Sequence, residues 1–368
     1  MLEVADIFRL HGGAYRERFG SRLLPSHKQA MADIQACRTA YFGGHIDRCD
    51  HCGREVYVYH SCCNRHCPKC HREQTERWLE KQKARLLPCS YYLLTFTLPQ
   101  ELRALALANQ KKIYGLLMRC AAAALKKLAR DPRDLGASLG CLAVLHTWTR
   151  TMLYHPHVHL LVTAGGLSAD ATEWIKPRHS AFLVPVEALM TIFRAKICAA
   201  LKKAHLLTDV PSSLWKKKWV VHCQPAGHGE KVLQYLARYV FRIAITNSRL
   251  EKIENGQVTF RYRDSRSQEV RHVTLAGTEF IRRFLLHVLP RGCAKVRHYG
   301  ILSNSCRRSL EKARGLLPSS SSNTISDSAP IRSSDPPASF QKNSVCPYCK
   351  VGHLIQIDFL PRYRREPP

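Results

Sequence analysis

Two pairs of cysteines constrain the fold of this chain more than any other feature of its sequence. Cys49 and Cys52 form one Cys-x-x-Cys pair, and after fourteen residues Cys67 and Cys70 form a second. Two such pairs across a gap of this length supply the four thiolates of a tetrahedral zinc site. Four sulfur ligands leave no open coordination position for a substrate. We therefore predict that these four cysteines hold a structural zinc.

The identity of the ligands stays open, because other metal-binding side chains crowd the same region. Cys62 and His66 lie between the two pairs and would either replace a ligand or serve a second ion. Much later in the chain, Cys346 and Cys349 form a further pair with no second pair beside it. They predict half a zinc site, which a distant residue would have to complete.

The sixteen cysteines of this chain would also suit a disulfide-rich secreted protein. The amino terminus, however, has no basic patch followed by an apolar run, so we expect no signal peptide. Cysteine pairs spaced as metal ligands fit a reducing, cytosolic setting better than an oxidising one.

The charge of the chain is strongly one-sided. Lysine and arginine number 57 against 28 aspartates and glutamates, which gives a formal net charge of +29. Such a field attracts polyanions, and nucleic acid is the first candidate partner, ahead of an acidic membrane surface. The longest apolar stretch, 181–207, is interrupted by charged residues and falls short of the roughly 20 apolar residues of a membrane span. We therefore expect nucleic acid rather than a membrane as the partner.

A histidine-rich strand is the next feature with chemical meaning. His157 and His159 flank Val158 in a run of apolar residues. Alternate side chains of a strand face the same way, so the two imidazoles lie about 6.6 Å apart along it and can grip one divalent ion. His155 shares their face but lies about 13 Å from His159, so all three cannot easily share one ion.

A second strand, residues 142–149, precedes the histidine strand after a short connection. Consecutive strands joined in this way pair antiparallel. His146 would then lie beside His157 or His159, depending on a register that the sequence does not fix. Residues 91–98, rich in aromatic and β-branched side chains, predict another buried strand.

Residues 229–242 predict a helix with an unusual polar side. An apolar stripe covers one side of it, and the opposite sector holds two tyrosines and three cations: Tyr235, Tyr239, Lys231, Arg238 and Arg242. One interpretation places the tyrosines at the edge of a core helix, with their hydroxyls in solvent. The other makes them nucleophiles held among cations that neutralise a phosphate, which a divalent ion would polarise.

In their order along the chain, these features resemble one protein family. The resemblance rests on the motifs Cys49-x-x-Cys52, Asn64-Arg65-His66-Cys67-Pro68-Lys69-Cys70, Thr95-Phe96-Thr97-Leu98-Pro99, Leu145-His146-Thr147-Trp148, His155-Pro156-His157-Val158-His159 and Tyr235-x-x-x-Tyr239. They are similar to the rolling-circle transposases of the IS ninety-one insertion-sequence type, within the HUH (His-hydrophobe-His) endonuclease superfamily. Each motif is modest by itself, but the ordered set is specific.

The resemblance implies an α+β fold, with an antiparallel ferredoxin-like sheet and its helices plus a small amino-terminal zinc-binding domain. It also implies that His157 and His159 bind Mg or Mn. Tyr235 and Tyr239 would then cut single-stranded DNA at the element ends, through a 5′-phosphotyrosine link. The implied activity is the nicking and joining of DNA strands in rolling-circle transposition.

HUH nucleases usually take a third metal ligand from outside the histidine pair, often from a neighbouring strand. For this role we choose His146, with His155 and Asp170 as alternatives. The predicted DNA contacts are the cations of the tyrosine helix, Lys231, Arg238 and Arg242.

The predicted division of the chain has four parts. They are a helical and four-cysteine zinc-binding domain (1–87), an HUH nuclease/transposase catalytic domain (88–312), a disordered Ser/Pro-rich linker (313–341) and a Cys-x-x-Cys tail (342–368). The resemblance implies a prokaryotic, cytoplasmic and nucleoid-associated enzyme, and a homo-oligomer is compatible with it. The alternative function is a zinc-ribbon DNA-binding protein without catalysis, in which the histidines and tyrosines are structural.

Overall fold

The structure, a computed structural model, describes residues 2–83, 85–179, 182–207, 210–228, 244–264, 267–318 and 345–363, with the side chains of 71–75 and 77 left aside. The predicted tyrosine helix lies outside the described residues, and so do Lys231, Tyr235, Arg238, Tyr239 and Arg242. Within the described ranges, no helix is both long and apolar enough to cross a membrane.

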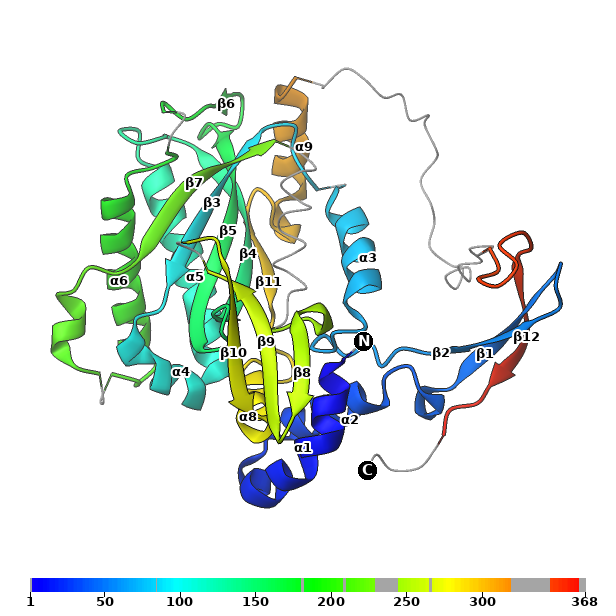
Figure 1. The fold of residues 1–368 in the computed structure, drawn as a ribbon. Coiled ribbons are helices and arrows are strands. Elements are labelled where there is room, and N and C mark those ends of the chain that lie inside the picture. The colour runs from blue at the N-terminus through cyan, green and yellow to red at the C-terminus, as the bar shows by residue number, and fades with distance from the viewer. Residues whose placement is uncertain are drawn as a thin grey trace.

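A six-stranded antiparallel sheet lies at the centre of the molecule (Figure 1). Its strands are β3 (Ser90–Thr97), β4 (Ser138–Trp148), β5 (Tyr154–Leu167), β6 (Trp174–Ile175), β7 (Val221–His228) and β11 (Val296–Gly300). They run in the order β11-β4-β5-β3-β7, and β6 pairs with β5. With the helices between them, β3, β4, β5 and β7 have the βαββαβ connectivity of a ferredoxin-like fold. The predicted α+β fold with an antiparallel sheet is therefore confirmed.

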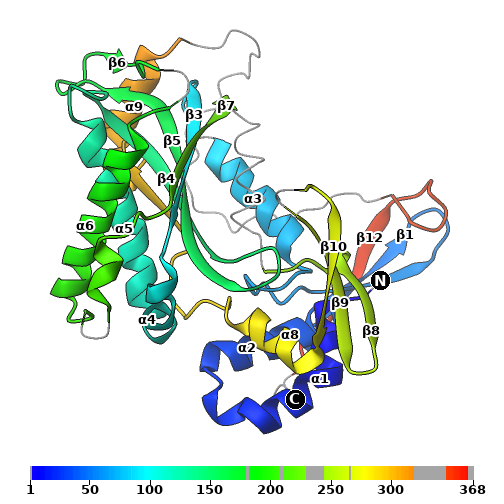
Figure 2. The same cartoon turned by 60° about the vertical axis from the view of Figure 1, so that its left-hand side comes forward.

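Three helices cover one face of this sheet (Figure 2). They are α4 (Arg103–Ala108), α5 (Gln110–Ala129) and α6 (Val186–Lys203). In α5, the buried residues Ile113, Leu117 and Ala121 recur every four positions and form a single stripe. They share one core with Leu94 and Phe96, alternate residues of β3 that point to the same side of the sheet. The helical spacing in α5 and the strand alternation in β3 therefore both direct their buried residues into this one core.

The opposite face of the sheet carries a smaller core at one end. The helices on this side are α3 (His71–Lys83) and α9 (Arg307–Leu316) (Figure 1). Val144 of β4, Leu161 of β5 and Ala313 of α9 are buried together there. His146 lies two residues beyond Val144, and His159 two residues before Leu161, so strand alternation places both on this face. The histidines therefore occupy the part of the face next to this core.

A separate core joins the amino-terminal helices to a much later part of the chain. Its elements are α1 (Val4–Phe19), α2 (Pro25–Ala36), β8 (Leu250–Glu254), β9 (Gln257–Arg263), β10 (Val270–Ala276) and α8 (Gly277–Leu285). The rings of Phe8 and Phe284 pack edge to face with their centroids 5.3 Å apart. A Cβ at Gly277 would collide with the ring of His11, so glycine is required for this close approach of α1 and α8.

The carboxyl-terminal strand completes a small sheet that the amino-terminal segment begins. The strands are β1 (Gly44–Cys49), β2 (Glu55–Tyr59) and β12 (Leu354–Leu360), in the order β12-β1-β2. Both views show β12 beside β1, set apart from the central sheet (Figures 1 and 2). The predicted boundaries separated these segments, as 1–87 and 342–368. The structure joins them, because β12 pairs with the edge of β1 that β2 leaves open.

Short 3-10 turns connect several of these elements. They lie at Gly20–Arg22, Ala40–Phe42, Gln100–Leu102, Ser212–Trp215, Asn247–Arg249 and Asn304–Cys306.

Candidate metal centres

Three histidines from two adjacent strands form the first candidate centre. In the β4–β5 pair, His146 lies directly opposite His157. One ring nitrogen from each of His146, His157 and His159 lies within 4.8 Å of the others. The His146 ring centroid is 5.3 Å from that of His157 and 4.7 Å from that of His159. The register that the sequence left open thus brings His146 to both members of the predicted pair.

Hydrogen bonds to the rings of His157 and His159 fix their orientation. Nδ1 of His157 donates to the carbonyl oxygen of His155 over 2.7 Å. Nδ1 of His159 is hydrogen-bonded to Oγ1 of Thr95 on β3, at 3.0 Å. Bonds of this kind hold an imidazole in the tautomer that binds metal through Nε2. Thr95 was not predicted as part of the site, because its contact depends on the register of β3 against β5.

Burial keeps these histidines uncharged. It lowers the pKa of His157 to about 4, an effect that the hydrogen bond to the His155 carbonyl partly opposes. Burial, and then the charge of His157, lower the pKa of His159 to about 3. The neutral imidazole is the form that coordinates a metal ion. His157 and His159 are therefore in their metal-binding state at neutral pH.

The two alternatives for the third ligand have other roles. Arg103 donates to Nδ1 of His155 over 2.7 Å. Asp170 accepts hydrogen bonds from the hydroxyls of Ser168 and Thr172 in a turn. Neither residue belongs to the group of converging histidine nitrogens. Of the three residues considered for this position, His146 alone has the geometry.

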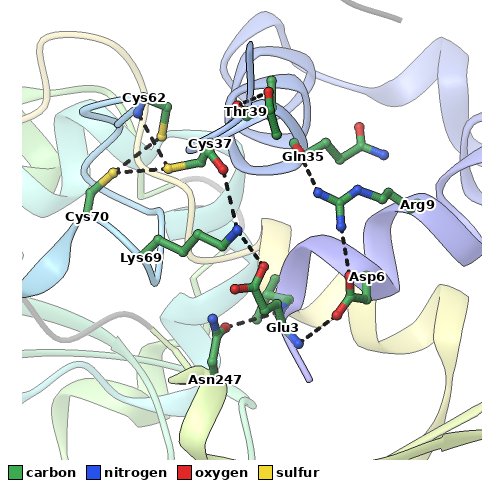
Figure 3. Close-up of polar contacts among 12 residues, drawn as sticks. Glu3, Asp6, Arg9, Gln35, Cys37, Thr39, Cys62, Lys69, Cys70 and Asn247 are labelled. Atoms are coloured by element: carbon green, nitrogen blue, oxygen red, sulfur yellow. Dashed lines mark hydrogen bonds and ion pairs between the residues drawn. The ribbon is translucent and has the colours of Figure 1, made fainter. Parts of the chain in front are cut away.

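The second candidate centre consists of four cysteine sulfurs, from Cys37, Cys62, Cys67 and Cys70, which all lie within 4.8 Å of one another. Cys70 Sγ is 3.5 Å from both Cys37 Sγ and Cys62 Sγ (Figure 3). Cys37, Cys67 and Cys70 are buried in the core of the amino-terminal helices. We refer to these four residues as the buried cysteine centre.

Lys69 ties the buried cysteine centre to the start of α1 (Figure 3). Its ammonium group lies 2.6 Å from the carboxylate of Glu3 and donates to the carbonyl oxygen of Cys37 over 3.4 Å. The Glu3 side chain is 27% exposed, so this ion pair is only partly screened by solvent.

The loop between Cys62 and Cys67 docks the buried cysteine centre on the chain that follows α8. The guanidinium of Arg65 donates to three backbone carbonyls, at 2.7 Å from the oxygen of Cys293, 3.2 Å from that of Leu289 and 2.9 Å from that of Pro290. Nε2 of His66 accepts from the amide of Leu289 over 3.2 Å. His66, an alternative zinc ligand by sequence, thus contacts the neighbouring segment rather than the sulfurs.

The third candidate centre corrects the prediction of one zinc site at Cys49, Cys52, Cys67 and Cys70. Cys49 and Cys52 converge instead with Cys346 and Cys349, with all four sulfurs within 4.8 Å. We refer to these four as the terminal cysteine centre. The predicted four-cysteine set is therefore divided between two centres, and the predicted half site at the carboxyl-terminal pair has its missing half. The physical reason is the pairing of β12 with β1, which carries one pair to the other.

Cys37 was missed because nothing in its local sequence marks it as a ligand. It has no cysteine partner nearby in the chain and follows directly after α2. The available signal was the surplus of cysteines around it, since Cys62 stood out as a spare ligand. A site that takes one ligand from a helix end gives no spacing pattern to detect.

Two family models match the chain. One, described as "Transposase zinc-binding domain", matches residues 7–98, and the other, described as "Putative transposase", matches residues 140–309. Among curated proteins, "Putative transposase y4qJ" of Sinorhizobium fredii is 41% identical over 97% of this chain and 95% of that protein. "Transposase for insertion sequence element IS801" of Pseudomonas savastanoi pv. phaseolicola is 29% identical over 77% of this chain and 72% of that protein. No solved structure matches the chain significantly.

The antiparallel sheet, the clustered cysteines and these matches together define a transposase with an amino-terminal zinc-binding domain. More particularly, the chain belongs to the IS ninety-one type family of transposases, and the predicted resemblance is confirmed. Membership of this family makes DNA the partner of the chain. The zinc-binding domain and its cysteines support the predicted structural zinc.

Proposed function

We propose that this transposase nicks and joins single-stranded DNA, with Tyr235 and Tyr239 as nucleophiles and a divalent ion held by His146, His157 and His159. The observation that carries the proposal is the convergence of three imidazoles from β4 and β5 on one face of the sheet. The tyrosines lie outside the described residues, so their role rests on the sequence pattern and the family resemblance.

The proposed reaction is a phosphoryl transfer without net loss of bond energy. A tyrosine oxygen forms a bond to phosphorus as the bond from phosphorus to the 3′ oxygen breaks. Overall, the tyrosine proton passes to the leaving 3′ oxygen, which departs as a hydroxyl, and the 5′ phosphate stays on the tyrosine. Because the covalent link keeps the phosphodiester energy, rejoining needs no ATP. A second tyrosine permits a second transfer before the first strand is released.

The ligand set also bears on which ion the site takes. When bound, a divalent ion would polarise the scissile phosphate and orient it for attack. Imidazole nitrogen is a better ligand for transition ions, whereas Mg prefers oxygen. Of the two predicted ions, we therefore expect Mn to support faster nicking than Mg at equal concentration. The positions of the rings would be maintained by Thr95 and by the carbonyl of His155.

We further propose that the structural zinc of the amino-terminal domain is held by Cys37, Cys62, Cys67 and Cys70. The four sulfurs offer a closed set with no position for a substrate. The residues around them belong to a packed core, as expected where a metal ion supports folding.

The decisive experiment is a covalent trapping assay. Purified protein is incubated with Mn and labelled single-stranded DNA that covers both flanks of its own coding region, and is then denatured. We expect a denaturant-resistant adduct that disappears in the Y235F/Y239F double variant. The matched control is Y57F, which changes a tyrosine that is 55% exposed on the small sheet. An undiminished adduct in the double variant would refute the tyrosine assignment.

The metal assignment needs its own variant. H157A should lose nicking while it keeps its melting temperature and its affinity for the same DNA. A collapsed fold would instead make the histidine structural. Full DNA binding by the wild-type protein with no adduct under any divalent ion would favour the alternative, a DNA-binding protein without catalysis.

A further inference from the structure

We propose that Cys49, Cys52, Cys346 and Cys349 hold a second zinc ion, which fastens the carboxyl-terminal segment to the amino-terminal hairpin. This site is distinct from the structural zinc proposed above and does not depend on the nuclease mechanism. Its ligands come from two segments 300 residues apart in sequence.

The distances between the sulfurs fit this ion. Cys49 Sγ lies 3.6 Å from Cys349 Sγ, and Cys52 Sγ lies 3.8 Å from Cys346 Sγ. A tetrahedral zinc with Zn–S bonds of about 2.3 Å places its sulfurs about 3.8 Å apart. Each of these two contacts joins one amino-terminal and one carboxyl-terminal cysteine. The sulfurs of the two segments therefore interleave around one point.

The two pairs also share the hydrogen bonding of zinc knuckles. The amides of His51 and Cys52 both donate to Cys49 Sγ over 3.4 Å. The amide of Gly352 donates to Cys349 Sγ, also over 3.4 Å. Donors to sulfur favour the thiolate, the form that binds zinc. In both segments, an amide three residues after a cysteine therefore donates to the sulfur of that cysteine.

The backbone between the pairs leaves room for little else. The amide of Asp50 donates to the carbonyl of His353 over 3.1 Å, and the amide of His353 donates to Asp50 Oδ1 over 2.7 Å. A Cβ at Gly352 would lie only 2.6 Å from Cys49 Sγ and from Asp50 Oδ1. Glycine at this position is therefore what allows the two knuckles to come into contact.

The small sheet needs such an ion, because its strands present large apolar side chains to solvent. Tyr57 is 55% exposed, Ile355 is 55% exposed and Phe359 is 73% exposed. A unit of this size without a buried core usually depends on a metal or a disulfide for stability. The four thiols supply the means, and a thiol set in a reducing cell would take zinc.

The first test counts sulfur-bound metal by cobalt substitution. Cobalt bound to thiolate shows a sulfur-to-cobalt absorption band, which cobalt bound to the histidine cluster does not contribute to. In the full-length protein, C346S/C349S should lower this band to about half, as expected when one of two four-thiolate sites is lost. C306S, which changes a cysteine outside both centres, should leave it unchanged. An undiminished band in C346S/C349S would overturn the proposal.

A second test leaves every ligand in place. A protease recognition site is inserted within residues 319–344, and the cut protein is analysed by size exclusion. The carboxyl-terminal fragment should co-elute with the rest and separate when a zinc chelator is added. Release without chelator, or co-elution that persists after both zinc ions are removed, would show that no metal fastens the segment.

Discussion

The buried and the terminal cysteine centres use the same ligands in opposite surroundings. Around the buried cysteine centre, Cys37 and Cys67 are 0% exposed and share a core with two helices. In the terminal cysteine centre, Cys49 and Cys346 are buried but Cys52 is exposed, and the sheet beside it presents Phe359 to solvent. A metal ion in the buried cysteine centre would stabilise a core that already exists. A metal ion in the terminal cysteine centre would substitute for a core.

The two centres also differ in what they hold together. The buried cysteine centre is linked through Arg65 to the segment after α8, and so to the unit that carries the histidines. The terminal cysteine centre joins β12 to the β1–β2 hairpin. Loss of the first should therefore damage the whole molecule, and loss of the second should release one segment.

The largest expected difference is in folding. C67S replaces a fully buried ligand, and we expect it to cost more than about 4 kcal/mol, or to prevent soluble expression, because loss of a metal is among the most destabilising changes. C349S, the matched change in the terminal cysteine centre, should leave the main unfolding transition in place. Thermal unfolding followed by circular dichroism measures both. Equal transitions in the two variants would contradict the comparison.

The next effect concerns the docking loop. R65A removes three charge-assisted hydrogen bonds to backbone carbonyls and should lower the free energy of unfolding by about 3 kcal/mol. The control is R133A, whose side chain is 89% exposed and should matter by less than about 0.5 kcal/mol. Urea unfolding distinguishes them. If both variants lose the same small amount, the loop does not anchor the cysteine centre.

The histidine cluster is covered by strands rather than helices, and it is intermediate between the two cysteine centres. We therefore expect a smaller effect there. T95V removes the hydrogen bond to His159 and should weaken Mn binding by about 10- to 100-fold. T274V removes a threonine–threonine bond in the β9–β10 hairpin and serves as the control. Mn titration followed by electron paramagnetic resonance gives the affinities. Unchanged affinity in T95V would exclude a role for this hydroxyl in positioning the ring.

The smallest effect tests how open the terminal cysteine centre is. Arg54 lies over the ring of Tyr348, 4.9 Å from its centroid. Because Tyr348 is 55% exposed, Y348A should cost only about 0.5–1 kcal/mol. Metal retention against a competing chelator should then fall about two- to fivefold at this site and remain unchanged at the other. A loss at both sites would mean that the centres are coupled.

Sequence reasoning predicted best what depends on short-range periodicity. The alternation of His157, Val158 and His159 placed the two imidazoles on one face, and the structure has them there. It did not give the position of His146, because register depends on the pairing of whole strands and on an irregularity between His146 and Trp148. The sequence left open whether His146 lies beside His157 or His159, and the fold brings its ring close to both.

The cysteines show the same limit over a longer range. Spacing identified Cys49 with Cys52 and Cys67 with Cys70 as pairs, but it could not tell which pairs meet. Cys37 follows the end of a helix, and the pairing of β12 with β1 brings Cys346 to its partners. The positions of both cysteines therefore depend on tertiary contacts. Local spacing predicts that a cysteine binds a metal ion, and the tertiary fold determines to which of the two centres it belongs.

Because β12 pairs with β1, the small sheet and its cysteine centre can form only after the carboxyl-terminal segment has been synthesised. Cys49 and Cys52 leave the ribosome long before their partners, because Cys349 is 300 residues further along the chain. At about 5–20 residues per second, the first pair waits roughly 15–60 s for the second. A chain interrupted before Cys346 would keep Cys49 and Cys52 without their partner thiols and the edge of β1 open, and translation through β12 would supply both partners.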